Sequence, residues 1–337
     1  MTLILKFDPL KPELTIDRAG EIIKKGGLVA FPTDTVYGLG ADAYNPKAVL
    51  KVFKVKNRPL NQPLPLLISS KDSLTEVSSK IPDEVYRVID EAWPGPLTVI
   101  VKKSGKVPRE VTGGGDKVGV RIPAHPVALN LISEVNSPLT GPSANIHGKP
   151  SPITAKHVEE DLYGKINAII DGGEALLGLE STVVDFTTTP PTLIRPGMFE
   201  VEKLREIIGE LNIPRIVAGE TEKYSLKTPV LLVKGGDPGK VAEKIREAAL
   251  IKLKEGLRVA VASTSECSHR YADLNISIFD LGSRGNTYMV AKRVFNFLRE
   301  IDGESVDLAI VEGVEEKGIG LAVMNRLKKA AKKSITV

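Results

Sequence analysis

Short apolar runs that each end in a proline- or glycine-rich segment are the feature that most constrains the fold of this chain. The run Leu28–Phe31, for example, leads directly into Pro32-Thr-Asp-Thr. Because such segments cannot continue a strand ladder, each run predicts a short strand that ends in a loop at a sheet edge. Helical spacing at Ile16, Ala19 and Ile23 predicts a helix before the first run. The other expected strands are Leu64–Ile68, Leu97–Val101, Val118–Ile122, Ala168–Ile170, Thr182–Phe186 and Thr192–Ile194.

A simpler alternation of strands and helices begins after residue 229. Between residues 211 and 229 the hydrophobic period lapses, and Gly219, Ser225 and Pro229 interrupt a mostly polar stretch. We therefore expect a first domain over residues 1–210, a linker over 211–229 and a second domain over 230–337. The alternation of short strands and helices in the second domain predicts a parallel, doubly wound α/β sheet. Its expected strands are Val230–Val233, Val259–Ala262, Ile276–Phe279 and Leu308–Val311, with helices near residues 240–255, 286–300 and 319–332.

Composition excludes several classes of protein. The 337 residues suffice for two domains, and 46 Lys and Arg against 42 Asp and Glu leave a net charge of only +4. Because nucleic-acid binding needs many clustered cations, this balance makes any anion site local. The single cysteine cannot form an internal disulfide, and no apolar run reaches the roughly 18 residues of a membrane span, so we expect a cytoplasmic protein. Four histidines and one cysteine show no metal-ligand spacing.

Four loops and one strand end combine hydroxyl, amide or cationic side chains with residues that fix or expose the backbone. Each has an ordinary alternative: Lys56 and Arg58 suit a solvated helix C-terminus. Arg121 and Arg195 suit structural ion pairs, and Ser143 and Asn145 suit a turn. Taken together they indicate recognition of phosphate or carboxylate groups. The residues are Thr33, Thr35, Lys56, Arg58, Arg121, Ser143, Asn145 and Arg195.

An ordered set of motifs extends this pattern along the first domain. The motifs are Pro32-Thr-Asp-Thr-Val-Tyr-Gly-Leu-Gly40, Lys56-x-Arg58, Trp93-Pro-Gly-Pro-Leu-Thr98, Val120-Arg-Ile-Pro123, Pro142-Ser-Ala-Asn145, Glu180-Ser-Thr182 and Arg195-Pro-Gly197. They occur in the order found in the YrdC-type threonylcarbamoyl-AMP synthases, a family that the chain resembles. The tail Glu312–Arg326 is similar to the ending of the long, two-domain members, so the resemblance covers both domains.

The resemblance implies a fold and a reaction. The implied fold is α/β, with a twisted mixed sheet around a central cationic cavity, followed by a smaller, doubly wound (Rossmann-like) domain. The implied reaction converts L-threonine, bicarbonate or carbon dioxide, and ATP into threonylcarbamoyl-adenylate and pyrophosphate. A separate tRNA threonylcarbamoyl transferase complex would then place the group on the adenosine beside the anticodon. Mg²⁺ is expected to accompany the triphosphate, without a protein-only metal site.

The resemblance also implies roles for the residues that match its motifs. The expected catalytic cluster comprises Lys56, Arg58, Ser143 and Asn145. Besides Arg58 and Ser143, the residues expected to bind ATP are Gln62, Lys117, Ser151, Arg195 and Tyr224. The residues expected to hold threonine are Thr33, Arg121 and Ser181, with Arg121 binding the carboxylate through two parallel hydrogen bonds.

Three positions or segments depart from the family's pattern. Leu67 stands where long members usually have a histidine, so the contact of that histidine with substrate is expected to be absent. Asp34 replaces the commoner glutamate and is one methylene shorter. The linker segment Ala218–Lys227 lacks most of the motif that folds over the active site in long members, so closure over ATP is expected to differ.

Two other functions remain open from the sequence. The first is carbamoyl transfer through a carbamoyl-adenylate on the same fold, but related proteins of that kind carry extra acylphosphatase-like and zinc-finger regions that this chain lacks. The second is a module that binds tRNA or double-stranded RNA without synthase activity. The near balance of charges and the 5% aromatic content argue against strong RNA binding, so any contact with tRNA is expected to be weak.

Overall fold

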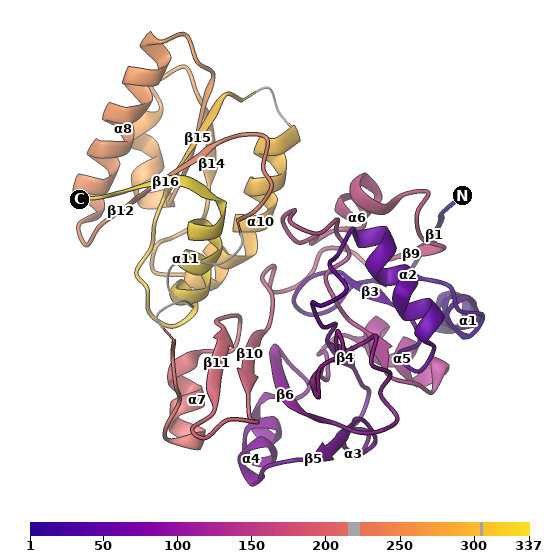
Figure 1. Cartoon of the computed structure of the whole chain (residues 1–337). Helices are drawn as coiled ribbons and strands as arrows, with labels where there is room; N and C mark the ends of the chain where they lie inside the picture. The colour runs from indigo at the N-terminus through magenta and orange to yellow at the C-terminus, as the bar shows by residue number, and fades with distance from the viewer. Residues whose placement is uncertain (215–222, 304–305) are drawn as a thin grey trace. The chain divides into compact units, whose positions relative to one another are not determined.

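A computed structural model describes residues 1–214, 223–303 and 306–337. The chain divides into two compact units, each of which is considered by itself (Figure 1). The first contains Met1–His147 and Ser151–Pro214, and the second contains Gly148–Pro150 and Arg215–Val337. The linker expected over residues 211–229 falls in part on residues 215–222, which lie outside the described residues, as does the first half of the divergent segment 218–227.

The first unit is built on two mixed sheets within residues 1–214, all of which the structure describes. One sheet has the strand order β1-β9-β2-β3, and the larger has the order β11-β10-β6-β7-β4-β8, with β5 paired to β6. Its strands are β1 (Leu3–Lys6), β2 (Val29–Phe31), β3 (Gly38–Gly40), β4 (Leu66–Leu67), β5 (Ser78–Lys80), β6 (Leu97–Lys103), β7 (Lys117–Arg121), β8 (Leu139–Thr140), β9 (Ala168–Asp171), β10 (Thr182–Asp185) and β11 (Thr192–Arg195). Its helices are α1 (Pro12–Lys24), α2 (Pro46–Lys56), α3 (Leu74–Val77), α4 (Asp83–Ala92), α5 (Pro126–Val135), α6 (Ala155–Leu162) and α7 (Val201–Ile208).

Helix α1 shows how the sequence pattern forms the core of this unit. Pro12 stands at its first position, where the missing N–H costs no hydrogen bond. The predicted stripe of Ile16, Ala19 and Ile23 is buried and packs in one cluster with residues of α5 and β9. The turn after the helix closes at Gly26, whose φ of +76° suits glycine.

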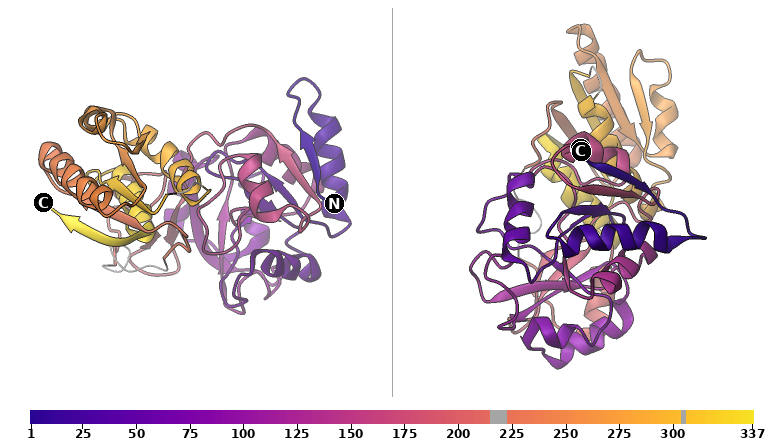
Figure 2. Two further views of the ribbon diagram at one scale, coloured as in Figure 1. Left: turned by 90° about the horizontal axis from the view of Figure 1, so that it is seen from above. Right: turned by 90° about the vertical axis from the view of Figure 1, so that its right-hand side faces the viewer.

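The second unit contains a parallel sheet with the strand order β14-β13-β15-β12-β16 in residues 223–303 and 306–337. Right-handed crossovers place α8 and α9 on one face of this sheet and α10 and α11 on the other (Figures 1 and 2). Its strands are β12 (Val230–Lys234), β13 (Val259–Ser263), β14 (Ser277–Asp280), β15 (Leu308–Glu312) and β16 (Ala331–Thr336). Its helices are α8 (Pro238–Lys254), α9 (Ser265–Ser268), α10 (Thr287–Gly303), α11 (Ile319–Ala330) and a 3₁₀ helix (His269–Tyr271).

The structure confirms the predicted fold class and refines its elements. Every strand predicted from an apolar run is present, with ends that differ by one or two residues. The sequence did not predict β1, β3, β5, β8 or β16. The helix expected near residues 319–332 is wrong at its end, because Ala331–Thr336 forms β16 and pairs with β12. In the described part of the chain, no helix is both long and apolar enough to cross a membrane.

Candidate active site

A cavity of about 420 Å³ lies in the first unit, over one face of the larger sheet. Side chains alternate along a strand, so residues two apart share a face. The lining follows this period on three neighbouring strands: Thr98 and Ile100 on β6, Lys117, Gly119 and Arg121 on β7, and Ser181, Val183 and Asp185 along β10. Loops then bring further residues to the cavity, among them Thr33, Arg58, Ser143, Glu180 and Arg195.

Arg121 is the most deeply buried cation of the cavity wall, with 6% of its surface exposed. Its guanidinium donates from Nε to the Gly95 carbonyl (2.9 Å), from Nη1 to Thr35 Oγ1 (2.7 Å) and from Nη2 to Asp34 Oδ1. Burial lowers the pKa of Arg121, and the charge of Asp34 opposes that effect, so the group stays protonated. A guanidinium has five N–H donors, so two remain for a ligand in the cavity.

Lys56 lies behind the cavity wall and does not line it. Its Nζ donates to the carbonyl oxygens of Ser143 (2.5 Å) and Asn145 (2.6 Å), while Ser143 Oγ donates to Asn145 Oδ1 (2.5 Å). Burial, followed by the charge of Arg58, lowers the pKa of Lys56 to about 7. The ammonium therefore fixes the loop that presents Ser143 to the cavity.

Arg58 and Arg195 reach the cavity from two parts of the first unit that lie far apart in the sequence. Arg58 leaves α2 after the left-handed Asn57 and is held through Nε and Nη2 by the carbonyl oxygens of Gln62 (3.2 Å) and Pro63 (3.0 Å). Arg195 ends β11 and donates from Nη2 to the Ser181 carbonyl (2.9 Å). Such contacts orient both guanidinium groups at the cavity wall.

The close approach behind Arg195 requires glycine at position 197. A Cβ added to Gly197 would lie 2.2 Å from the carbonyl carbon of Ser181, well inside van der Waals contact. The Arg195-Pro-Gly197 motif is thus explained by packing of one backbone against another.

Two carboxylates balance part of the positive charge. Asp185 accepts from Lys117 Nζ (2.8 Å) and from Thr187, and Glu180 accepts from Ser151 Oγ (2.6 Å). Burial alone would raise the pKa of Asp185, but the hydrogen bonds from Lys117 and Thr187 lower it. Four cationic and two acidic side chains therefore line the cavity, which suits an anionic ligand.

The structure brings together most of the residues expected from the sequence. Those that line the cavity are Thr33, Arg58, Lys117, Arg121, Ser143, Ser181 and Arg195. Lys56, Asn145 and Ser151 lie directly behind residues that line it, through the contacts given above. The backbone carbonyl of Gln62 accepts from Arg58 Nε, and Tyr224 belongs to the second unit, where its ring packs edge-on against Phe295. The individual binding roles of all these residues stay predictions.

Sequence reasoning assigned no binding role to three acidic residues that shape the cavity. Asp34 holds Arg121 together with Thr35, Asp185 pairs with Lys117, and Glu180 lines the wall. The alternation along β10 from Ser181 was visible in the sequence and could have placed Asp185 on the same face as Ser181, a residue expected to bind threonine. The pairing of Asp34 with Arg121 depends on loop geometry that no local pattern reveals.

The two departures within the first unit also have structural counterparts. Leu67 lies beside Arg121 in the parallel register of β4 and β7, is 3% exposed and lines the cavity as an apolar wall. Asp34 is buried and, despite its shorter side chain, reaches Arg121; its second oxygen, Oδ2, has no hydrogen-bond partner among the described residues.

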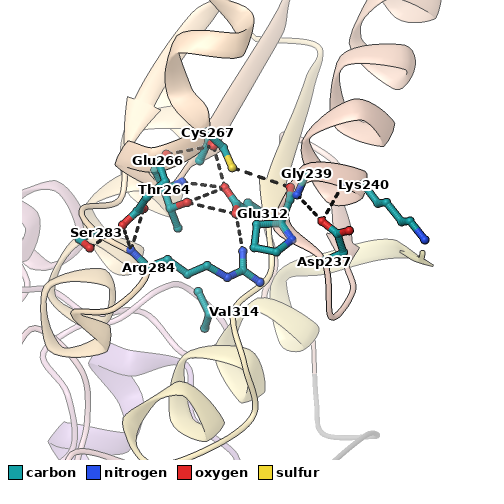
Figure 3. Close-up of polar contacts among 12 residues, drawn as sticks. Asp237, Gly239, Lys240, Thr264, Glu266, Cys267, Ser283, Arg284, Glu312 and Val314 are labelled. Atoms are coloured by element: carbon teal, nitrogen blue, oxygen red, sulfur yellow. Dashed lines mark hydrogen bonds and ion pairs between the residues drawn. The ribbon is translucent and has the colours of Figure 1, made fainter.

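The second unit carries a dense polar cluster at the ends of β13 and β15 (Figure 3). These neighbouring strands lead to helices on opposite faces of the sheet, a position where α/β proteins often bind ligands. Glu312 is fully buried there and accepts from Ser263 Oγ (2.7 Å), from Thr264 N (2.8 Å) and Oγ1 (3.1 Å), and from Arg284 Nη1 (2.5 Å). The carboxylate is therefore satisfied by protein groups and closes this end of the sheet.

No group of three or more His, Cys, Asp or Glu residues that could hold a metal ion occurs among the described residues. In the first unit, oxygen donors at the cavity come instead from single side chains such as Ser143 and Glu180. Mg²⁺ usually keeps several waters and binds through one or two carboxylates plus substrate phosphates. This donor set fits a magnesium ion that arrives with a triphosphate.

Two family models match adjoining parts of the chain. The model described as "Telomere recombination", for the Sua5, YciO and YrdC proteins, matches residues 21–197. The model described as "Threonylcarbamoyl-AMP synthase, C-terminal domain" matches residues 199–332.

Similar proteins and structures agree with these matches. The threonylcarbamoyl-AMP synthase of Pyrococcus abyssi is 44% identical over 342 residues, covering 98% of each chain, and that of Bacillus subtilis is 37% identical over 327 residues, covering 94% of this chain and 92% of the other. The structure of P. abyssi Sua5 complexed with L-threonine has a TM-score of 0.93 at 42% identity and covers 100% of this chain and 99% of that one. Escherichia coli YciO has a TM-score of 0.54 at 26% identity and covers 58% and 96% of the two chains. The chain therefore belongs to the threonylcarbamoyl-AMP synthase family, in its long, two-domain form.

Proposed function

We propose that this chain forms threonylcarbamoyl-adenylate and pyrophosphate from L-threonine, bicarbonate or carbon dioxide, and ATP in the cavity of the first unit. The product would supply the threonylcarbamoyl group for tRNA modification by a separate transferase. Family membership supports the reaction, and the cationic cavity supports the location. The P. abyssi protein whose structure contains L-threonine covers the whole of this chain.

The chemistry requires two anions to be held close together. The amine of threonine is first carboxylated to a carbamate, and a carbamate oxygen then attacks the α-phosphorus of ATP and displaces pyrophosphate. Since the carbamate is a weak nucleophile, alignment and charge stabilisation matter more than a strong base. Four cationic side chains around one cavity suit this requirement.

Arg121 is proposed to bind the threonine carboxylate with its two remaining N–H donors. Asp34 and Thr35 hold its guanidinium in place, and Leu67, its neighbour on β4, presents an apolar surface to the amino acid. Thr33 and Ser181 line the same cavity and supply hydroxyl groups at its wall. This arrangement favours a small amino acid over a long or charged one.

The nucleotide phosphates are proposed to lie between Arg58, Ser143, Lys117 and Arg195. Lys56 acts on them through the loop that it fixes, because its ammonium contacts the carbonyl oxygens of Ser143 and Asn145. Ser151, Gln62 and Tyr224 are proposed as further ATP contacts from family resemblance. Mg²⁺ bound to the triphosphate would neutralise phosphate charge, and Ser143 and Glu180 are oxygen donors of the cavity wall that could contact it.

The observation that carries this proposal is that seven of the site residues expected from the family resemblance line one cavity. The test is to incubate the protein with bicarbonate and Mg-ATP, with or without L-threonine, and to measure pyrophosphate. We expect release that depends on threonine and a product with the mass of threonylcarbamoyl-adenylate. Pyrophosphate release that is the same without threonine would refute the proposed substrate.

A further inference from the structure

A second cavity, of about 400 Å³, lies in the first unit and shares no lining residue with the candidate active site. The described residues that line it include three lysines and two asparagines but no acidic side chain. They are Leu28, Lys51, Lys54, Val55, Asn57, Lys165 and Asn167.

Hydrogen bonds hold the walls of this second cavity in place. Lys51 Nζ, on α2, donates to the Gly26 carbonyl (2.7 Å), and Lys165 Nζ donates to the Asp161 carbonyl (2.8 Å). The amide oxygen of Asn167 accepts from the backbone N–H of Leu28 (2.9 Å). The turn after α1, the end of α2 and the segment before β9 are thus joined around one space.

Several donors at this cavity remain available. The side chains of Lys54 and Asn57 and the amide nitrogen of Asn167 make no hydrogen bond or ion pair within the described residues. Elsewhere in the unit, exposed lysines such as Lys24 and Lys25 pair with Glu134 and Glu21. Lys51, Lys54 and Lys165 are also exposed, but none of them forms an ion pair with a carboxylate among the described residues.

The end of α2 opposes an anion only weakly. A helix C-terminus carries about half a negative charge. Here the carbonyl oxygens of Phe53 and Lys54 already accept from the backbone N–H groups of Arg58 and Asn57. Three ammonium groups at the cavity outweigh the partial charge of this helix end.

We propose that the second cavity binds a compact oligophosphate anion of the pyrophosphate class. Phosphate oxygens accept several charge-assisted hydrogen bonds at once, which matches the lysine and amide donors present. A single cavity of this size suits a small anion, whereas an RNA backbone would need a longer basic stripe. Asn57 lines this cavity and the next residue, Arg58, lines the other, so the anion contacts the turn that joins the two sites.

Calorimetric titration with pyrophosphate, the probe chosen here, tests this proposal. Because the candidate active site is also expected to bind pyrophosphate, we expect two sites per chain. The double variant Lys54→Gln/Lys165→Gln should weaken one site at least about tenfold, since charge-assisted bonds are about twice as strong as neutral ones. Arg58→Ala should weaken the other site. The two variants therefore separate pyrophosphate binding at the candidate active site, which tests the proposed function, from pyrophosphate binding at the second cavity, which tests this inference.

The matched control is Lys24→Gln/Lys25→Gln, which removes the same charge from paired lysines of the same unit. It should leave both pyrophosphate sites unchanged, and thermal unfolding should show that all variants fold. Titrations in which Lys54→Gln/Lys165→Gln binds pyrophosphate as the unsubstituted protein does would overturn the proposal. A second result would also overturn it: the Lys54→Gln/Lys165→Gln variant loses binding of a single-stranded RNA oligonucleotide but keeps its binding of pyrophosphate.

Discussion

Arg121 and Glu312 are buried charged residues at the carboxyl ends of strands, one in each unit. Arg121 is 6% exposed and lines a cavity, with two N–H donors left after its bonds to Gly95, Thr35 and Asp34. Glu312 is fully buried and accepts from Ser263, Thr264 and Arg284. A buried charge costs free energy unless it is paired, so a cation with spare donors at a cavity indicates ligand binding, whereas a carboxylate bonded on all sides indicates structural closure.

Replacing Arg121 should have the largest effect, and it tests whether this buried cation binds a ligand whereas Glu312 serves the fold. Arg121→Met should lower kcat/KM for threonine by about two to four orders of magnitude, since loss of one partner of a buried charge pair costs about 3–5 kcal/mol. It should also destabilise the fold, because Asp34 is left buried without its cation. The measurements are steady-state kinetics at varied threonine and urea unfolding.

The double variant Arg121→Met/Asp34→Asn separates the two effects. It removes the uncompensated carboxylate, so stability should recover while activity stays low. Activity restored together with stability would mean that Arg121 serves the fold alone.

Replacing Glu312 tests the other side of the comparison. Glu312→Gln removes the charge that faces Arg284 and should lower the free energy of unfolding of the second unit by about 2–4 kcal/mol. Glu247→Gln, an exposed pair with Lys244 on α8, is the matched control and should cost below about 0.5 kcal/mol. Urea unfolding with a probe in the second unit measures both. Equal effects of the two substitutions would contradict structural closure by Glu312.

Lys56 offers a smaller test through pH. Its folded pKa of about 7 lies below the unfolded value, so the unfolded chain binds more protons between about pH 7 and 10 and stability rises with pH across this interval. Below pH 7 both states are protonated and the destabilisation is fully present. Relative to Lys56→Met, the protein should gain roughly 1–3 kcal/mol between pH 7 and 9 in urea unfolding. If the free energies of unfolding of the protein and of Lys56→Met change in parallel between pH 7 and 9, Lys56 does not titrate in this way.

The sequence predicts strands best where apolar runs are short and end at proline or glycine. It misses strands such as β1 and β16, whose residues are mostly polar or exposed and gain their order from a neighbouring strand. For Ala331–Thr336 the two lysines continue the polar face of α11, but pairing with β12 satisfies the backbone as a strand instead. Local pattern cannot reveal a partner strand that lies far away along the chain.

The candidate site shows the same division between local and distant information. Resemblance and strand position predict Arg121 and Arg195, and alternation along β10 predicts the face of Asp185. The burial of Lys56 could not be predicted, because its carbonyl partners lie 87 and 89 residues away. The ion pair between Asp34 and Arg121 could not be predicted for the same reason: the two residues are also 87 positions apart, and only the fold brings the loop after β2 next to β7.

Threonine-dependent pyrophosphate release by the Arg58→Ala variant tests the central claim most directly. Arg58 contacts backbone carbonyl oxygens at the cavity wall, and its side chain is partly exposed, so the variant should fold with nearly unchanged thermal stability. If the cationic cavity carries out the reaction, release should fall at least about a hundredfold, as expected when a transition-state charge contact is lost. Release at the level of the unsubstituted protein, in a folded variant, would contradict the account and leave an RNA-binding role for the cavity's charge.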